Sequence, residues 1–279
     1  MGINRRNDSR LTRNRILEFS LRQLNELGAP SVTTTSIAEG MGISPGLLYY
    51  HFRNKYDIIN SLFESFEQEM DRLLKCPRGH AITLKWSWSH IQYLSEFMWS
   101  YRFLYLDIND LLLHSRTLEV KFKRIVERKK DFALEFCGQL LEFGEMEATP
   151  EQLDAMCTSI VVVITYWLSF QFLQHARHYN DAERIRAHLH GSSYHIISIL
   201  APHLRGGARE AYNQLICEYE VSTQGRPFEA GDGHRPLSID DAAIALDDGR
   251  DLGSIHAAIR HGRTRAVEHV MVDQTDVQK

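Results

Sequence analysis

The chain has 279 residues, of which 43% are hydrophobic and 24% charged, and its net charge is −4. This composition is typical of a soluble globular protein of one or two domains, and the first residues lack the apolar core of a secretory signal. The four cysteines lie far apart without Cys-x-x-Cys spacing, which favours reduced thiols in the cytoplasm over a disulfide framework.

The charge is unevenly distributed along the chain. Residues 1–55 hold eight Lys or Arg against four acidic residues, a net +4, so the remaining residues carry −8. A basic end on an acidic body favours binding to a phosphate backbone. A solvated, charged helix end is the alternative explanation of the same pattern.

The first predicted element is a helix over residues 8–27, where apolar residues recur at helical spacing. Gly28 and Pro30 supply its stop signals. The next helix is predicted to begin with Thr34 as its N-cap, with Ile37, Ala38 and Met41 facing inward.

Gly42 then breaks the chain into a turn. Ser44 is predicted to cap a third helix, and Pro45 occupies its first position, where a missing N–H does no harm. Two short helices joined by a glycine-containing turn are typical of a helix-turn-helix, whose second helix enters the DNA major groove. We therefore expect residues 33–56 to bind DNA.

The rest of the chain also favours helices. An amphipathic helix is predicted over 56–74, and an aromatic-rich segment follows the loop at 76–79. No segment alternates at period two, so the predicted fold class is all-α. Further helices are expected at 117–143, 151–178, 182–200 and 208–220.

These elements divide into three parts. Residues 1–55 are the predicted helix-turn-helix DNA-binding domain, or head, and residues 56–222 form a helical body for effector binding and dimerisation. Glycine, proline and acidic pairs mark 223–279 as a linker and an appended tail. Within the tail, 254–271 is similar to part of an ankyrin repeat, although a short amphipathic helix explains it as well.

The head resembles the TetR family of bacterial transcription regulators. The resemblance rests on Thr34, Ile37-Ala38, Gly42-Ile43-Ser44, Leu48-Tyr49-Tyr50-His51-Phe52 and Asn54-Lys55. Residues 101–111 and 201–205 resemble the body of PhaD-type regulators, which are associated with polyhydroxyalkanoate gene clusters. The resemblance covers about residues 10–220 and leaves out the tail.

The resemblance implies which side chains meet double-stranded DNA. Threonines at the start of the second helix would contact the backbone or a base edge, the first turn of the third helix would contact bases, and later residues would grip phosphates or thymine methyls. Tyr50 and Phe52 have a second explanation as core residues of the head. The implied set is Thr34, Thr35, Ser44, Pro45, Gly46, Leu47, Tyr49, Tyr50, His51 and Lys55.

The body is expected to form a homodimer and to hold a small apolar effector. Two-fold operators require two heads at a fixed spacing, and the resemblance implies that the helices at 151–178 and 182–200 form the dimer surface. The first of these helices is apolar on nearly every face, so it needs a partner as well as its own core. Ordinary core packing is the alternative explanation of each aromatic residue taken alone. The candidates for the pocket are Phe63, Phe66, Trp86, Phe97, Met98, Trp99, Phe103, Tyr166, Trp167 and Phe170.

We therefore expect a cytoplasmic, nucleoid-associated regulator whose affinity for a palindromic operator is controlled by an acyl-like effector. The resemblance to PhaD-type regulators implies a role in polyhydroxyalkanoate or fatty-acid metabolism. Two alternatives remain: a regulator controlled by a protein partner through the tail, and a multidrug or efflux repressor of the same family. No catalytic motif, cofactor motif or metal-ligand spacing is present in the sequence, and we expect no membrane span.

Overall fold

The structure, a computed structural model, describes residues 2–77, 83–179 and 182–224. These residues form α-helices and short 3-10 turns, and the β-bridge between Met146 and Leu204 extends into no strand within them. The predicted all-α fold class is confirmed. The predicted tail lies outside the described residues from 225 onward, as does the ankyrin-like segment.

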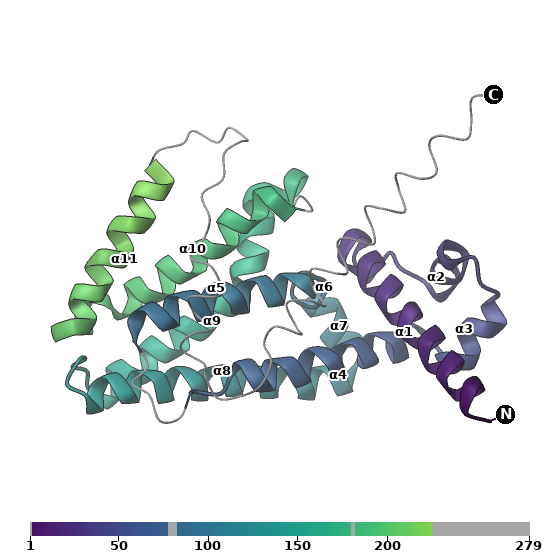
Figure 1. Ribbon diagram of the computed structural model, residues 1–279, viewed down its shortest axis with the longest axis horizontal. Helices are drawn as coiled ribbons and strands as arrows, with labels where there is room; N and C mark the ends of the chain where they lie inside the picture. Colours follow the sequence, from purple (N-terminus) through teal and green to yellow (C-terminus); the bar gives the residue numbers. More distant parts are fainter. Residues whose placement is uncertain (1, 78–82, 180–181, 225–279) are drawn as a thin grey trace. The chain divides into compact units, whose positions relative to one another are not determined.

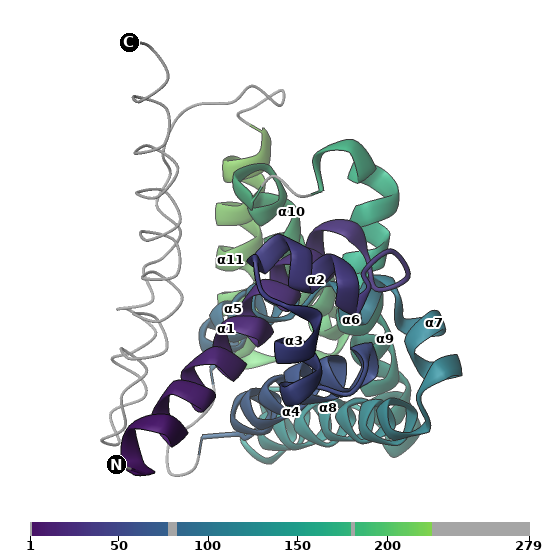
Figure 2. The same cartoon turned by 90° about the vertical axis from the view of Figure 1, so that its right-hand side faces the viewer.

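Three helices make the head: α1 (Gly2–Leu27), α2 (Thr34–Met41) and α3 (Pro45–His51). Helix α1 begins before the predicted start at residue 8 and ends as predicted at Gly28, whose φ of 79° suits a residue without a Cβ. Figure 2 looks onto these helices, with α2 and α3 in front. The side chains buried between them are Ile16, Leu24, Ile37, Ala38, Leu48 and Phe52.

Helix α4 (Lys55–Leu73) leads from the head into the body. Asn54 caps it, because its Oδ1 accepts a hydrogen bond of 3.0 Å from the backbone N–H of Asp57. Figure 1 shows α4 running beside α8 (Arg116–Glu142). Ion pairs join the two helices, with Lys121 Nζ 3.6 Å from Glu64 and 3.7 Å from Glu67.

The body continues with α5 (Leu84–Ser100), α6 (Phe103–Leu106) and α7 (Ile108–His114) before α8. Helix α9 (Pro150–His175) packs between α8 and α10 (Ala182–Leu200), and α10 also packs along α5. Two short 3-10 turns, η1 (Ala176–His178) and η2 (Ala201–His203), precede α10 and α11 (Gly206–Gln224) respectively. The predicted helices at 117–143, 151–178, 182–200 and 208–220 are thus present within a few residues.

Phe66 lies in the middle of the aromatic core beneath α4. Its ring stacks on Phe97 at a centroid distance of 5.6 Å and contacts Phe63 and Tyr101 at 5.5 Å each. Phe66 and Phe63 are fully buried. Such aromatic pairs add about 0.5–1.5 kcal/mol each beyond the area they bury, so this cluster fixes α4 against α5.

Hydrogen bonds tie the head to the body at the far end of α5. Asn25 on α1 donates from Nδ2 to the carbonyl of Ser100 at 2.8 Å and accepts from the backbone N–H of Phe103 at 3.2 Å. The backbone N–H of Ala29 donates to Asp107 Oδ2 at 2.6 Å. The end of α1 is therefore fixed to the α5–α6 corner, and the head cannot turn there without breaking these bonds.

Three of the four thiols are buried in the body. Cys76, Cys137 and Cys157 belong to one apolar cluster with Met146 and Leu204, and Cys217 is exposed. Burial raises the pKa of Cys76 to about 12, so this thiol stays protonated at neutral pH. The buried cysteines act as small apolar side chains, and all four are free.

By length and composition alone, α9 is apolar enough to cross a membrane. It packs along α8 and α10, and about 44% of its most apolar window is buried inside the body. Its apolar character therefore fits a core helix that also exposes one apolar face.

Candidate nucleic-acid interface and internal cavity

Capping hydrogen bonds from Ser and Thr side chains fix the two helices of the helix-turn-helix. Ser44 Oγ accepts from the backbone N–H of Leu47 at 3.2 Å, and Pro45 occupies the first helical position, as predicted. Gly42 closes α2 with φ of 63°. The N-cap of α2 is Thr33 and not Thr34, because Thr33 forms a reciprocal capping box with Ser36, each bond being 3.0 Å.

Thr34 therefore has a different position from the predicted one. It is the first residue of α2, and its Oγ1 lies 3.3 Å from the hydroxyl of Tyr49 on α3. This contact links the start of α2 to the exposed face of the third helix.

The exposed surface of α3 holds most of the predicted DNA contacts. Tyr50 is 76% exposed and Tyr49 51%, so the alternative placing of Tyr50 in the core of the head is wrong. Phe52, at 3% exposure, does belong to that core. The predicted residues that are exposed are Thr35 on α2, Ser44 at the N-cap of α3, and Pro45, Gly46, Leu47, Tyr49 and Tyr50 on α3.

His51 is half-buried at the end of α3, and its ring meets that of Tyr50 edge-on at 5.0 Å. Burial, and then the nearby charge of Arg13, lower the pKa of His51 below its usual value. The imidazole is therefore neutral at pH 7 and offers an N–H rather than a positive charge. Arg13 also donates to Ser61 Oγ at 2.8 Å, which holds α1 against α4.

The ammonium of Lys55 was predicted from the sequence to contact a phosphate, but in the structure it contacts the protein itself. Its Nζ donates to the backbone carbonyl of Ala29 at 2.6 Å. Because Ala29 is also bonded to Asp107, Lys55 belongs to the joint between head and body. Arg53, an exposed cation directly after α3, was not among the predicted contacts, although its place at the end of that helix was visible in the sequence.

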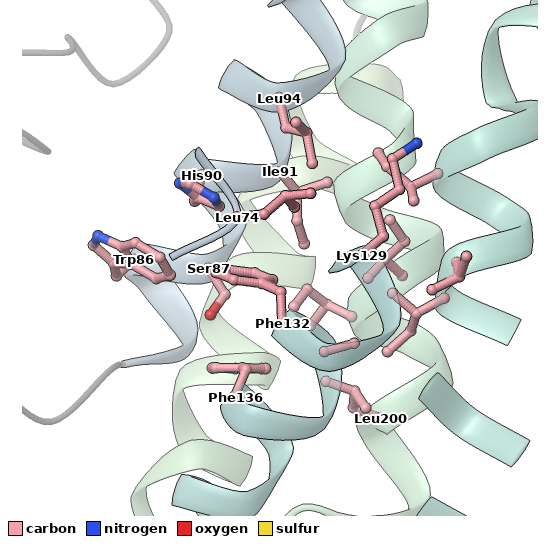
Figure 3. Close-up of a pocket in the computed structure, with 16 residues that line it drawn as sticks. Leu74, Trp86, Ser87, His90, Ile91, Leu94, Lys129, Phe132, Phe136 and Leu200 are labelled. Carbon is pink, nitrogen blue, oxygen red and sulfur yellow. The ribbon is translucent and has the colours of Figure 1, made fainter. Parts of the chain in front are cut away.

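The body contains a cavity of about 50 Å³. It lies between the C-terminal end of α4 and helices α5, α8, α9 and α10 (Figure 3). Hydrocarbon makes up nearly all of its wall, with Ser87, His90 and Lys129 as the polar residues. The lining residues are Leu74, Trp86, Ser87, His90, Ile91, Leu94, Lys129, Phe132, Ala133, Phe136, Ile160, Val161, Ile164, Ile196, Ile197 and Leu200.

Of the ten predicted pocket residues, Trp86 lines this cavity. Tyr166 and Phe170 are exposed, at 55% and 48%, and Trp167 packs on Phe170 with ring centroids 5.6 Å apart. Trp99 is half-buried, with the guanidinium of Arg102 over its ring at 4.5 Å. The remaining five are buried in the aromatic core and fill space themselves: Phe63, Phe66, Phe97, Met98 and Phe103.

Lys129 is buried and His90 half-buried at this cavity, and burial lowers the pKa of each. The pKa of His90 falls to about 4, so its ring is neutral; its Nε2 lies 2.9 Å from the carbonyl of Leu73 at the end of α4. The pKa of Lys129 falls to about 7. Lys129 was missed in the sequence because it sits in a run of charged residues.

Helix α9 exposes an apolar stripe along one face. Val162, Tyr166, Phe170 and Leu173 follow one another at helical spacing and are 52%, 55%, 48% and 78% exposed. Large contiguous apolar patches of this kind mark interaction surfaces. We call these four residues the α9 stripe.

Comparison with known proteins places the chain in a family. A family model described as bacterial regulatory proteins of the tetR family matches residues 16–62, and one described as bacterial transcriptional repressor matches residues 65–212. A solved TetR-family transcriptional regulator from Marinobacter aquaeolei VT8 is 31% identical, with a TM-score of 0.68, over 75% of this chain and 98% of that one.

Curated relatives match mainly the head. The class A tetracycline repressor of transposon 1721 from Escherichia coli is 36% identical over 22% of this chain and 28% of its own length. The regulator AcrR of Shigella flexneri is 29% identical over 26% of this chain and 34% of its own. The matches span about a quarter to a half of the length of such relatives. The family consists of DNA-binding transcription factors and not of enzymes, and this chain belongs to the TetR family of bacterial transcriptional repressors.

Proposed function

We propose that the protein is a homodimeric repressor whose affinity for a palindromic operator is controlled by a small apolar effector in the body cavity. The observation that carries the proposal is the exposed surface of α3, where Leu47, Tyr49 and Tyr50 stand on a helix fixed by its own cap. Large side chains are rarely left in water on so short a helix without a partner. In this fold the partner is the major groove.

The surface suits a particular mode of DNA reading. Hydroxyls of Thr35, Tyr49 and Tyr50 and the N–H of His51 would donate to phosphate oxygens and fix the register. Pro45, Gly46 and Leu47 bring no side-chain hydrogen bonds, so base contacts would rest on thymine methyls and on backbone groups. Sequence-dependent DNA shape would supply further discrimination.

Two contacts would connect the cavity to the head through α4. Leu74 at the end of α4 lines the cavity, and the neighbouring carbonyl of Leu73 is held by His90. The opposite end of α4 begins at Lys55, which is bonded to the turn after α1. An effector that moves the cavity wall would therefore displace α4 and change the spacing of two heads, provided that it binds the two arrangements with unequal affinity.

The apolar wall and the PhaD-like segments support an acyl-like effector and a place in polyhydroxyalkanoate or fatty-acid metabolism. Cytoplasmic location at the nucleoid follows from operator binding. One experiment distinguishes this proposal from its two alternatives, the multidrug repressor and control through the tail. Operator sites are first selected from random duplex DNA. Fatty acids, antibiotics and deletion of residues 225–279 are then each tested for release of the selected DNA. Absence of any selected site would contradict the proposal.

Leu47→Ala is expected to reduce the preference of the protein for operators with thymine over operators with uracil. Burying one methyl group stabilises a complex by about 0.8 kcal/mol, roughly a fourfold change in affinity. Replacing a contacted thymine by uracil should therefore weaken the wild-type complex about fourfold and leave the Leu47→Ala complex nearly unchanged. Fluorescence anisotropy with operators that carry single thymine-to-uracil replacements measures this.

Tyr50→Phe provides the matched control for that measurement. It removes one hydroxyl from the same exposed helix and should weaken binding to all operator variants by a similar factor, leaving the sensitivity to uracil intact. If Leu47→Ala keeps the full response to uracil at every position, Leu47 does not contact a thymine methyl.

A further inference from the structure

Lys129 is a buried cation without an acidic partner among the described residues. Its side chain is 3% exposed, and its Nζ donates to Thr165 Oγ1 on α9 at 3.2 Å and lies 5.1 Å from the ring centre of Tyr105. A buried charge is costly unless an opposite charge compensates it. An ammonium group has three donors, so the bond to Thr165 leaves capacity for a further acceptor.

The same side chain forms part of the cavity wall. Figure 3 shows Lys129 extending beside the apolar residues, with its nitrogen on the side of the view away from Trp86 and His90. The ring of Tyr105 lies beside this amine, and its hydroxyl is buried and has no hydrogen-bond partner among the described residues. Lys129 is thus the one Lys or Arg residue in the wall of an otherwise hydrocarbon cavity, and no carboxylate belongs to the described residues that line it.

We propose that the effector is a monocarboxylic acid with an apolar tail, and that its carboxylate pairs with the ammonium of Lys129 while the tail lies among the apolar residues of the cavity. This inference rests on the proposed function, since it names the ligand class of the same cavity. One lysine balances one negative charge. A phosphate monoester carries about −1.5 to −2 at pH 7, which would leave part of its charge uncompensated.

The size of the cavity limits the tail and gives it a mechanical effect. A space of about 50 Å³ accommodates a few water-sized groups, so a longer acyl chain must push the surrounding helices apart. The carboxylate would hold one end of the ligand on α8 while the tail presses toward Leu74 and Ile91 on α4 and α5. Displacement at Leu74 is the movement that would reach the head through α4.

Calorimetric titration of the full-length protein tests the inference with straight-chain carboxylates of about four to ten carbons and the primary amides of equal length. The acids are expected to bind at least about tenfold more tightly than their amides at pH 7. In Lys129→Met the acids should lose that advantage, while amide binding is unchanged or stronger. Lys130→Met is the matched control, because Lys130 is the neighbouring lysine on the surface and pairs with Asp154 at 2.6 Å.

Proton uptake provides a readout that a merely structural lysine would not give. Burial places the pKa of Lys129 at about 7, so at pH 8 most of the amine is neutral, and a bound carboxylate should draw a proton onto it. Of the titratable groups nearby, His90 has a pKa of about 4, and burial raises that of Tyr105, so both stay neutral. Titrations in buffers of different ionisation enthalpy should show uptake approaching one proton per acid.

Each outcome decides between the two proposals. Equal affinity for acids and amides, no acid binding, or an acid preference that survives in Lys129→Met would overturn the carboxylate inference. If neutral ligands alone bind and release operator DNA, effector control stands without it. If acids bind through Lys129 and leave operator affinity unchanged, the site stands and effector control through this cavity fails.

Discussion

Replacing Lys129 by methionine is expected to stabilise the protein at pH 6 by several kcal/mol. Burial lowers the pKa of this lysine from 10.5 to about 7 in the folded chain. A difference of about 3.5 pKa units corresponds to roughly 5 kcal/mol of penalty for folding with the charged side chain. Loss of the hydrogen bond to Thr165 offsets about 1 kcal/mol of the gain, and methionine fills a similar volume.

The gain should decrease as the pH rises. Between the folded and unfolded pKa values the unfolded chain binds the additional proton, so the wild type becomes more stable with increasing pH while the methionine variant does not. Between pH 6 and pH 9.5 the advantage of Lys129→Met should shrink by about 3 kcal/mol. Urea unfolding at a series of pH values, followed by circular dichroism, measures the difference.

Lys130→Met separates burial from the loss of a charge. Lys130 lies one residue further on and pairs with Asp154 near the surface, so its removal should change stability by less than about 1 kcal/mol at any pH. A stability difference between Lys129→Met and wild type that stays constant from pH 6 to pH 9.5 would show that Lys129 is hydrated in the folded protein.

The sequence predicted the helix-turn-helix because its signals are local. Gly42, Ser44 and Pro45 each act on backbone groups within four residues, and the structure uses all three as predicted. The N-cap of α2 was misplaced by one residue because Thr33, Thr34 and Thr35 are all capable caps. Ser36 decided between them, since only Thr33 stands three residues before it and can form the reciprocal capping box.

The cavity could not be predicted in the same way, because helical spacing shows that a side chain is buried and not which neighbour it meets. Phe66 and Phe97 were predicted to line the pocket, but their rings stack on each other. Lys129 did leave a signal. Leu118, Phe122 and Ile125 set a repeat of three and four residues on α8 that continues through 129, 132 and 136, so a lysine occupies a core position.

The second large effect concerns the α9 stripe, through which we expect the proposed dimer to form. A double replacement, Tyr166→Asp with Phe170→Asp, is expected to convert the proposed dimer into a monomer, because it would place four uncompensated charges in a symmetric interface. Operator affinity should then fall by about 100-fold or more, since the second half-site is bound only through its link to the first. Native mass spectrometry and anisotropy titration measure the two effects.

A control variant distinguishes the interface from general damage to the body. Tyr166 and Phe170 are 55% and 48% exposed in the single chain, so the charges should leave the helical content of the monomer, measured by circular dichroism, almost unchanged. Phe143→Asp alters an aromatic residue that is 62% exposed at the end of α8, outside the stripe, and should leave a dimer with full operator affinity. If the double variant remains dimeric, the chain pairs through another surface, and the spacing of the two heads must be set there.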